Sequence, residues 1–553
     1  MTLARPPFDG LTCLAEETGP TPLGPEPERA ESVTVRAHDG TSLATDVYLP
    51  AGRGRFSAVL CRLPYDKTGD HAWIPAVASR LVDAGFAFVA QDVRGKARSD
   101  GAREPFVHEA ADGSATLDWI EAQRWSNGRI GMWGQSYYGY TQWAAAMTGH
   151  RALRCIVPQM TATAIGREWM YRQGVFQLQT MAEWGVWAWT DRPMLGFTID
   201  WRALPVRDLP QLWCGRTNPA LETWLLNGPR SGYWARLPAG QWEPRKLRAA
   251  VMSTGGFWDV FQRGQIDDHL RLASVKPPSL AHLRMASRDH FGSEWVRHGE
   301  RGPDYEHDPE LLDEALDRYI GNAPDWYHAC LNLQEAPQVR RVEFQIAGDD
   351  WHHADSWPPP DARPRTFWLR PGALCDQPGA RRSVGLGYDP ENPVPSLDEN
   401  PWRTLFDPSD RREIALRDDV AVFDSQAFRE PLMLAGPTRL RLPIEAESSA
   451  VHVHARLVDV AAGGSARLLG HGAAQVLRGR RRTIDLGHLA IRLERGHRLR
   501  LELSATDFPR YARAGVAGDW RTATSLTPGR LRYTLDHGAT LQVTTLAHPT
   551  GRA

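Results

Sequence analysis

One serine stands in a setting that predicts a nucleophile. Ser136 lies in the run GQSYYG, where a buried strand predicted over 129–134 gives way to the helix-like segment YYGYTQWAAAM. A tight turn between a strand and a helix strains the serine backbone and exposes the hydroxyl at the edge of the sheet. The run departs by one position from the usual G-x-S-x-G pattern, because its second glycine is Gly139. We interpret the run as a nucleophile turn rather than a chance Gly/Ser turn.

A serine hydroxyl needs a base within hydrogen-bond reach, and the base needs a third group that orients it. When the serine follows a strand in this way, the acid and then the histidine come later in the chain. Asp259 follows a strand predicted over 249–254, and His290 follows one predicted over 280–287. We therefore expect both side chains on strand-end loops at the sheet edge that carries Ser136.

Other residues could replace either partner. His269 lies in a predicted helix, and His282 lies within a predicted strand, where a structural imidazole is the favoured interpretation. Three further acids stay open as alternatives to Asp259, although they lack its position directly after a strand: Asp267, Asp268 and Asp289.

These side chains depend on a parallel sheet to bring them together. Short Val/Leu/Ile/Phe runs alternate with helical stretches, and continuous apolar runs are typical of parallel strands covered on both faces. The pattern predicts an α/β fold with a doubly wound sheet over 1–166 and 249–330. The strands that we expect in it are 58–63, 84–93, 129–134, 153–160, 249–254 and 280–287.

Two further regions have a different residue pattern. The insertion over 167–248 contains nine of the 22 tryptophans in helix-length segments, and we expect it to form a helical cap over the strand ends. From 331 to 553, short β-type runs are broken by Gly, Pro and Asp without a helical period, which predicts a jelly-roll β-sandwich. We count the run VRRVEFQIAG at 339–348 among its strands.

Composition and charge limit the class of protein. The 553 residues carry 65 Lys+Arg against 66 Asp+Glu, and this balance leaves no net field that would attract a nucleic acid. Because no apolar run approaches the roughly 20 residues that span a bilayer, we expect no membrane partner. The first residues lack the apolar core of an export signal, so we expect a cytoplasmic protein.

Metal and disulfide chemistry are also disfavoured. The six cysteines lie far apart without C-x-x-C spacing, which indicates reduced thiols. The run Trp351-His352-His353-Ala354-Asp355 contains metal-ligating residue types, but no further ligand set with metal spacing accompanies it, so a polar loop is favoured. We expect no metal and no cofactor.

Several segments together resemble the CocE/NonD hydrolase family, which is related to X-Pro dipeptidyl-peptidases and α-amino acid ester hydrolases. The resemblance spans nearly the whole chain. It is carried by RLPYDK at 62–67, QDVRGKARSDG at 91–101, GQSYYG at 134–139, GFWDVF at 256–261, DHFG at 289–292, GYDPENPVPSL at 387–397 and GHRLRLELSATDFPRY at 496–511.

The resemblance implies an α/β-hydrolase domain, a helical cap, a C-terminal jelly roll and the triad Ser136, Asp259 and His290. It also implies an oxyanion hole made by the Tyr65 hydroxyl and the backbone N–H of Tyr137. The chain departs from the family at 286–289, where Ala-Ser-Arg-Asp replaces a common Pro-Trp before the histidine. An acidic cluster common in the jelly roll is also replaced, at 447–452.

We therefore expect a serine hydrolase that cleaves an ester or amide of a small acyl substrate through an acyl-enzyme. The tryptophans of the cap favour a bulky or aromatic acyl group. Three other functions stay open: an X-Pro dipeptidyl-peptidase or α-amino acid ester hydrolase with Glu168 or Glu183 facing a substrate ammonium, an acyltransferase, and a binding protein without catalysis. Whether the chain forms a homo-oligomer also stays open.

Overall fold

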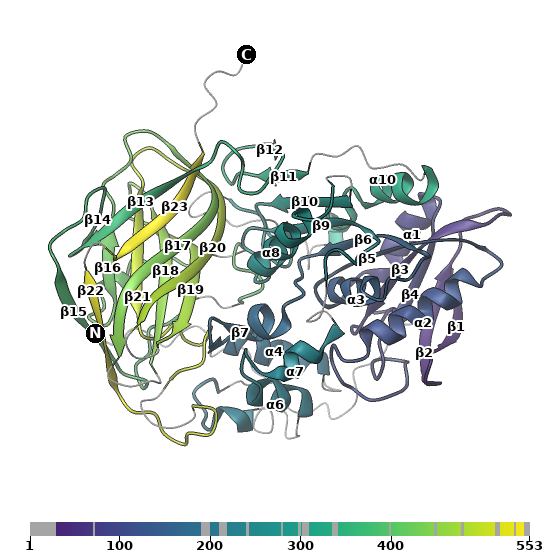
Figure 1. Cartoon of the computed structure of the whole chain (residues 1–553), viewed down its shortest axis with the longest axis horizontal. Coiled ribbons are helices and arrows are strands. Elements are labelled where there is room, and N and C mark those ends of the chain that lie inside the picture. Colours follow the sequence, from purple (N-terminus) through teal and green to yellow (C-terminus); the bar gives the residue numbers. More distant parts are fainter. Residues whose placement is uncertain are drawn as a thin grey trace, which may run out of the picture.

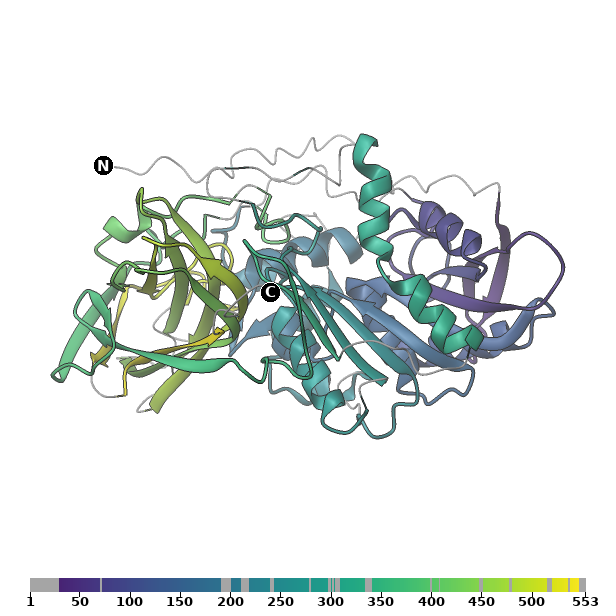
Figure 2. The ribbon, with the colours of Figure 1, turned by 90° about the horizontal axis from the view of Figure 1, so that it is seen from above.

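The computed structural model places two β-rich parts side by side (Figures 1 and 2). It describes residues 29–546 except 70–71, 190–199, 210–217, 239–242, 278–279, 297–299, 301–302, 304–308, 334–340, 398–399, 407, 447–450, 477–479, 515–519 and 536–537. Figure 2 shows the second sheet, in green and yellow, at one end of the molecule and the first sheet at the other. The expected α/β fold with a C-terminal all-β domain is confirmed.

The first sheet has ten strands, and those from β4 to β11 run parallel. Antiparallel strands close both of its edges. All six predicted buried strands belong to it. Its order is β1 (Glu31–Arg36), β2 (Ser42–Tyr48), β4 (Ala87–Asp92), β3 (Phe56–Leu63), β5 (Ser126–Gln135), β6 (Leu153–Gln159), β9 (Ala250–Gly256), β10 (Ala281–Ala286), β11 (Val342–Gln345) and β12 (Trp351–Ala354).

Helices connect and cover these strands. In α1, buried Ile74, Val77, Ala78 and Leu81 form one apolar face with helical spacing. All eleven residues of α3 are buried, so this helix lies within the core rather than over it. The bounds are α1 (Ile74–Asp83), α2 (Glu109–Glu121), α3 (Ser136–Ala146), α8 (Gln262–Ala273), η6 (Pro309–Leu311), α9 (Leu312–Ile320), α10 (Ala323–Tyr327) and η7 (His328–Leu333).

The expected place of the run at 339–348 is wrong. Its strand β11 pairs in parallel with β10, with Val342 opposite Leu283, whereas Ala347, beyond the end of the strand, forms an isolated bridge with Ile491 of the C-terminal sheet. Val342 and Phe344 pack with Leu283 and Met285 in one buried cluster. Alternation of apolar residues is the same in both kinds of sheet, so the pattern did not tell them apart. The other predicted domain limits stay predictions.

The C-terminal domain is built almost wholly of antiparallel strands around one apolar core, to which Leu440, Leu457, Leu501 and Val543 belong. Its elements are β13 (Arg363–Arg370), β14 (Ala373–Cys375), β15 (Arg382–Tyr388), η8 (Ile414–Leu416), β16 (Ala421–Asp424), β17 (Leu432–Ala446), β18 (His452–Val460), β19 (Ala466–Gln475), β20 (Arg480–Leu493), β21 (Arg498–Ser504), β22 (Gly529–Leu535) and β23 (Thr540–Leu546).

The insertion between β6 and β9 is mostly helical. Asn218 caps α6 by accepting the backbone N–H of Leu221, and Ser231 caps α7 in the same way. Of the tryptophans predicted there, Trp213 and Trp242 lie outside the described residues. The elements are η2 (Ile165–Met170), β7 (Tyr171–Arg172), β8 (Val175–Phe176), α4 (Leu178–Trp189), η3 (Val206–Asp208), α6 (Pro219–Leu226) and α7 (Gly232–Arg236).

In the part of the chain that the structure describes, each helix is too short or too polar to cross a bilayer.

Candidate active site

Ser136 is the first residue of α3, directly after β5, and its φ of 57° lies in the left-handed region that L residues rarely adopt. A Cβ at Gly134 would lie 2.2 Å from the Tyr138 ring, and one at Gly139 would lie 2.6 Å from Thr161 Cγ2. The second glycine therefore stands at position 139 because α3 packs there against the segment that follows β6. The expected strand–turn–helix context of the serine is present.

Asp259 and His290 form a buried hydrogen-bonded pair. Asp259 lies in the turn between β9 and α8, and its Oδ1 is 2.8 Å from Nδ1 of His290, in the loop after β10. Because Nδ1 is engaged, Nε2 is the imidazole nitrogen left for proton transfer. The Gln135 side chain, next to Ser136, donates to the His290 carbonyl at 2.6 Å and so binds the histidine loop to the nucleophile turn.

The competing residues have other surroundings. His269 and His282 are both buried, and burial lowers the pKa of His269 to about 3, which keeps its ring neutral. His282 packs against Trp326. Asp268 accepts the N–H and the hydroxyl of Thr163 at 2.7 and 2.6 Å. The contacts of His282 and Asp268 give these two residues structural roles.

Tyr65 links the serine to the cap. Its hydroxyl hydrogen-bonds to Ser136 and accepts the indole N–H of Trp184 at 2.9 Å. Burial raises the pKa of Tyr65 above its usual range, so the hydroxyl keeps its proton. The Tyr65 oxygen therefore joins the nucleophile to the Trp184 indole.

Tyr137 has its side chain elsewhere. The phenol donates to Glu109 Oε1 at 2.7 Å and accepts the Phe106 N–H at 2.8 Å. Its ring stacks on Phe106 with centroids 5.0 Å apart. The side chain therefore anchors α3, and only the backbone N–H, in the first helical turn, is of a kind that can serve an oxyanion.

Aromatic side chains from all parts of the chain surround this group. The His290 ring lies 4.9 Å from Trp402, in the C-terminal domain between β15 and η8, and 5.5 Å from Phe261. In the cap, Trp184 stacks on Trp224 at 5.4 Å. Sequence reasoning had missed Trp402 and Phe261, because no local pattern indicates which aromatic residue of a rich set meets the histidine.

The two cap acids differ sharply. Glu168 is paired with Arg172 at 2.5 Å, so its charge is already compensated. Glu183 is 7% exposed and hydrogen-bonds to Gln179, and among the described residues no cation pairs with it. Burial raises the pKa of Glu183 to about 8. Only Glu183 is thus a buried carboxyl without a compensating charge.

Asp289, an acid left open as an alternative partner, has a different contact. Its carboxylate is fully buried and accepts the backbone N–H groups of Ser293 and Leu405, each at 2.9 Å. Burial raises the pKa of Asp289 to about 7. Asp289, directly before the histidine, therefore ties the His290 loop to the segment that carries Trp402.

One group of side chains in the described part of the chain has ligand atoms close enough for a metal: Asp118, Glu121 and His150. His150 Nδ1 accepts the Ala152 N–H at 3.2 Å, which puts the ring proton on Nε2, 3.0 Å from Asp118. A protonated nitrogen cannot ligate, so this contact favours a hydrogen bond over a metal site.

The chain is similar in sequence to known hydrolases. The sequence profile of X-Pro dipeptidyl-peptidase (S15 family) matches residues 39–292, and that of the X-Pro dipeptidyl-peptidase C-terminal non-catalytic domain matches 332–538. Cocaine esterase from Rhodococcus sp. (strain MB1 Bresler) is 27% identical over 88% of this chain and 92% of its own length. A putative serine esterase from Mycobacterium bovis is 26% identical over 62% of this chain and 63% of its own.

Solved structures agree in fold. An aminopeptidase from the marine sediment archaeon Thaumarchaeota archaeon has a TM-score of 0.80 at 20% identity, covering 96% of this chain and 98% of its own. An α-amino acid ester hydrolase has a TM-score of 0.76 at 20% identity, with 93% and 96% covered. Both profiles and the predicted resemblance agree along the catalytic and C-terminal parts. The chain therefore belongs to the CocE/NonD hydrolases of the X-Pro dipeptidyl-peptidase S15 family, which are serine hydrolases acting on esters or peptides.

Proposed function

We propose that this enzyme hydrolyses esters or amides with a bulky apolar acyl group through an acyl-enzyme on Ser136. In the first step, His290 Nε2 takes the Ser136 proton while the oxygen attacks the acyl carbon. Asp259 holds the imidazole and stabilises its charge. The Tyr65 hydroxyl and the Tyr137 N–H stabilise the oxyanion, and the imidazolium then protonates the leaving group.

In the second step, water replaces the leaving group. His290 takes a proton from the water, which attacks the acyl carbon, and returns that proton to the Ser136 oxygen as the acid departs. Each step leaves the protein unchanged in charge, so its own residues suffice for the proton transfers.

The observation that carries the proposal is the contact of Tyr65 with both Ser136 and Trp184. It supports Tyr65 as an oxyanion donor beside the nucleophile, with an indole next to that donor. The proposed acyl group lies beside Trp184, whose ring packs on Trp224 and Trp169. Flat aromatic faces favour a bulky apolar group, because its burial is worth roughly 25 cal/mol per Å².

Two measurements test this function. A fluorophosphonate should label Ser136, with the adduct identified by mass spectrometry, and Ser136→Ala should abolish both labelling and hydrolysis. Ser293→Ala, which alters a buried serine near the histidine, is the matched control. We then expect kcat/KM for 4-nitrophenyl benzoate to exceed that for the acetate. A large preference for the acetate would contradict the proposed acyl group.

A second candidate, hydrolysis of α-amino acid esters or N-terminal peptide bonds, is favoured by Glu183. A substrate ammonium would supply the charge that this buried carboxyl lacks. The test compares phenylalanine methyl ester with 3-phenylpropionate methyl ester, which lacks only the amino group. If Glu183 binds the ammonium, Glu183→Gln should reduce the preference for the amino ester by roughly 10- to 100-fold. Equal rates for the two esters would rule this candidate out.

A further inference from the structure

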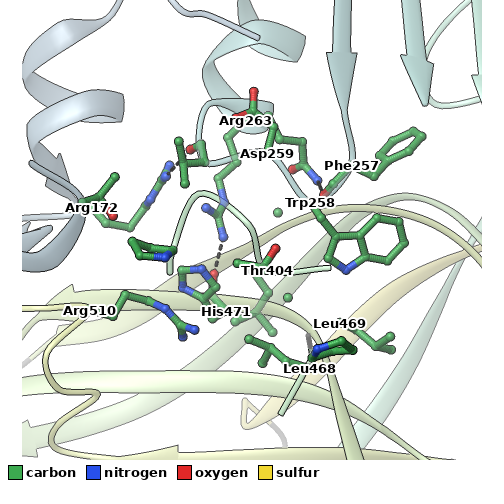
Figure 3. A pocket seen from close by; sticks show the side chains of 18 of the residues that line it. Arg172, Phe257, Trp258, Asp259, Arg263, Thr404, Leu468, Leu469, His471 and Arg510 are labelled. Atoms are coloured by element: carbon green, nitrogen blue, oxygen red, sulfur yellow. Dashed lines mark hydrogen bonds between the residues drawn. The ribbon is translucent and has the colours of Figure 1, made fainter. Parts of the chain in front are cut away.

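A small cavity, partly open to solvent, lies behind the turn that carries Asp259. Figure 3 shows Arg172, Arg263 and Trp258 on its catalytic side, with His471 and Arg510 facing them from the C-terminal domain. Strands β19 and β20 supply the wall of that domain. The cavity therefore lies at the interface between the two halves of the molecule.

Positive charge gathers around this cavity. Five arginines line it. Two of the carboxylates that pair with them, Glu502 and Asp507, also pair with a sixth arginine, Arg456. Burial keeps the pKa of His488 near 4, so that ring adds no charge. Asp259 also lines the cavity, and with it five carboxylates face six guanidinium groups. Four of the five lining arginines form an ion pair with an acid: Arg172 with Glu168, Arg263 with Asp485, Arg411 with Glu502, and Arg510 with Asp507. The fifth is Arg467.

Arg467 is the exception among them, because it makes no ion pair within the described part of the chain. It is 3% exposed, lies 3.6 Å above the Trp295 ring, and donates from Nη1 to the Val296 carbonyl. Asp459 lies directly across the strand pair from Arg467 and its charge acts on the guanidinium, but its ion pair is with His497 at 3.0 Å. Burial lowers the pKa of Arg467 to about 10, so it remains charged at neutral pH.

The unused donors of Arg467 have a defined chemistry. Its Nε and Nη2 groups are buried and have no hydrogen-bond partner among the described residues. These two N–H groups lie side by side on one edge of the guanidinium, and they match two oxygens of a phosphate or carboxylate. A buried cation with an idle pair of donors is costly, whereas a bound oxyanion would satisfy both its charge and its hydrogen bonds.

The opposite wall has complementary features. Arg263, on α8, donates from Nη2 to the His471 carbonyl on β19 and so already bridges the two halves. The Nε groups of Arg172 and Arg263 are likewise buried without a hydrogen-bond partner among the residues described. An anion at Arg467 would therefore lie in a field that arginines from both walls produce.

We propose that this cavity binds a small oxyanion between the catalytic half and the C-terminal domain, with Arg467 as its principal ligand. The anion neutralises the excess of arginine charge and fixes the β9–α8 turn, which presents Asp259, against β19. Asp259 lines this cavity and Ser136 does not, and the proposal does not depend on the substrate of the enzyme.

Inorganic phosphate is the probe. At constant ionic strength, with chloride as the replaced ion, phosphate should raise the thermal unfolding midpoint of the full-length enzyme by roughly 1–3 °C and then saturate. Calorimetric titration with phosphate should give one site per chain. Because phosphate also stabilises proteins by exclusion from their surface, the saturable part must be separated from a linear rise.

Variants decide the assignment. Arg467→Gln should abolish the saturable rise, and Arg467→Lys, which keeps the charge but not the paired donors, should weaken phosphate binding at least tenfold. Arg530→Gln alters an exposed arginine of β22 and should leave it unchanged. Circular dichroism and fluorophosphonate labelling show which variants are folded. A wild-type response without saturation, or the same saturable response in Arg467→Lys, would overturn the proposal.

Discussion

Among the side chains beside Ser136, the Tyr65 hydroxyl holds its proton because burial raises its pKa. Tyr65→Phe removes that donor and leaves the ring in place, so we expect kcat to fall about 10²- to 10³-fold with little change in KM. Tyr48→Phe is a matched control, because this buried tyrosine hydroxyl has no hydrogen-bond partner among the described residues. Steady-state kinetics on one ester measure both. Comparable losses in the two variants would remove Tyr65 from the oxyanion hole.

A second single residue, Glu183, makes the stability of the protein depend on pH. Its pKa is about 8 in the folded chain against an ordinary 4.5, so the folded state holds a proton that the unfolded state has released between these values. The contribution of Glu183 to stability therefore falls as pH rises from about 4.5 to about 8, and is constant above. Glutamine mimics the protonated acid without ionising.

We accordingly expect Glu183→Gln to match the wild type near pH 4.5 and to exceed it by about 2–4 kcal/mol at pH 8.5. Urea unfolding at the two pH values measures the difference. Glu413→Gln, at an exposed glutamate, should show none. A Glu183→Gln variant less stable than the wild type at pH 8.5 would show that the carboxylate has a charged partner.

At the scale of elements, the docking of α3 sets the geometry of the nucleophile. A Cβ at Gly139 would meet Thr161 Cγ2 at 2.6 Å and the Gln159 carbonyl at 3.0 Å, so Gly139→Ala must move the helix that begins at Ser136. We expect a loss of about 1–3 kcal/mol in stability together with lower kcat. Gly232→Ala, at a helical glycine with open space around it, is the control. If Gly139→Ala has the thermal unfolding midpoint and the ester kinetics of the wild type, this explanation of the glycine spacing is wrong.

Elements also mark where sequence reasoning succeeds. Buried parallel strands are continuous apolar runs, so the strands of the first sheet could be predicted. Position and order after these strands also make Ser136, Asp259 and His290 candidates, and the structure joins Asp259 to His290. The pairing of β11 could not be predicted, because an alternating strand suits either sheet until its partner is known. Asp289 was likewise beyond reach as an anchor, since its acceptor role depends on the Leu405 N–H, 116 positions away.

For the whole molecule, the C-terminal half takes part in the site rather than standing apart from it. Trp402 lies against the His290 ring, and Asp289 fastens the His290 loop to the Leu405 backbone beside it. The C-terminal domain thus contributes through its own loop between β15 and η8. Two contacts of the His290 loop, one to the nucleophile turn through Gln135 and one to this segment, hold the imidazole between the two halves.

This arrangement makes Asp289 a positioning residue, with a test that separates it from a merely structural one. Asparagine can accept only part of the hydrogen bonds that the carboxylate receives from Ser293 and Leu405, so Asp289→Asn should lower stability by about 1–3 kcal/mol and kcat/KM by about tenfold.

Asp268→Asn is the matched control, because Asp268 is also buried, also has a pKa raised to about 7, and also accepts a backbone N–H. Its loss of stability should be similar, but the rate of fluorophosphonate labelling at Ser136 should fall only in Asp289→Asn. If labelling slows equally in both variants, the anchor does not reach His290, and the C-terminal half has no part in positioning the base.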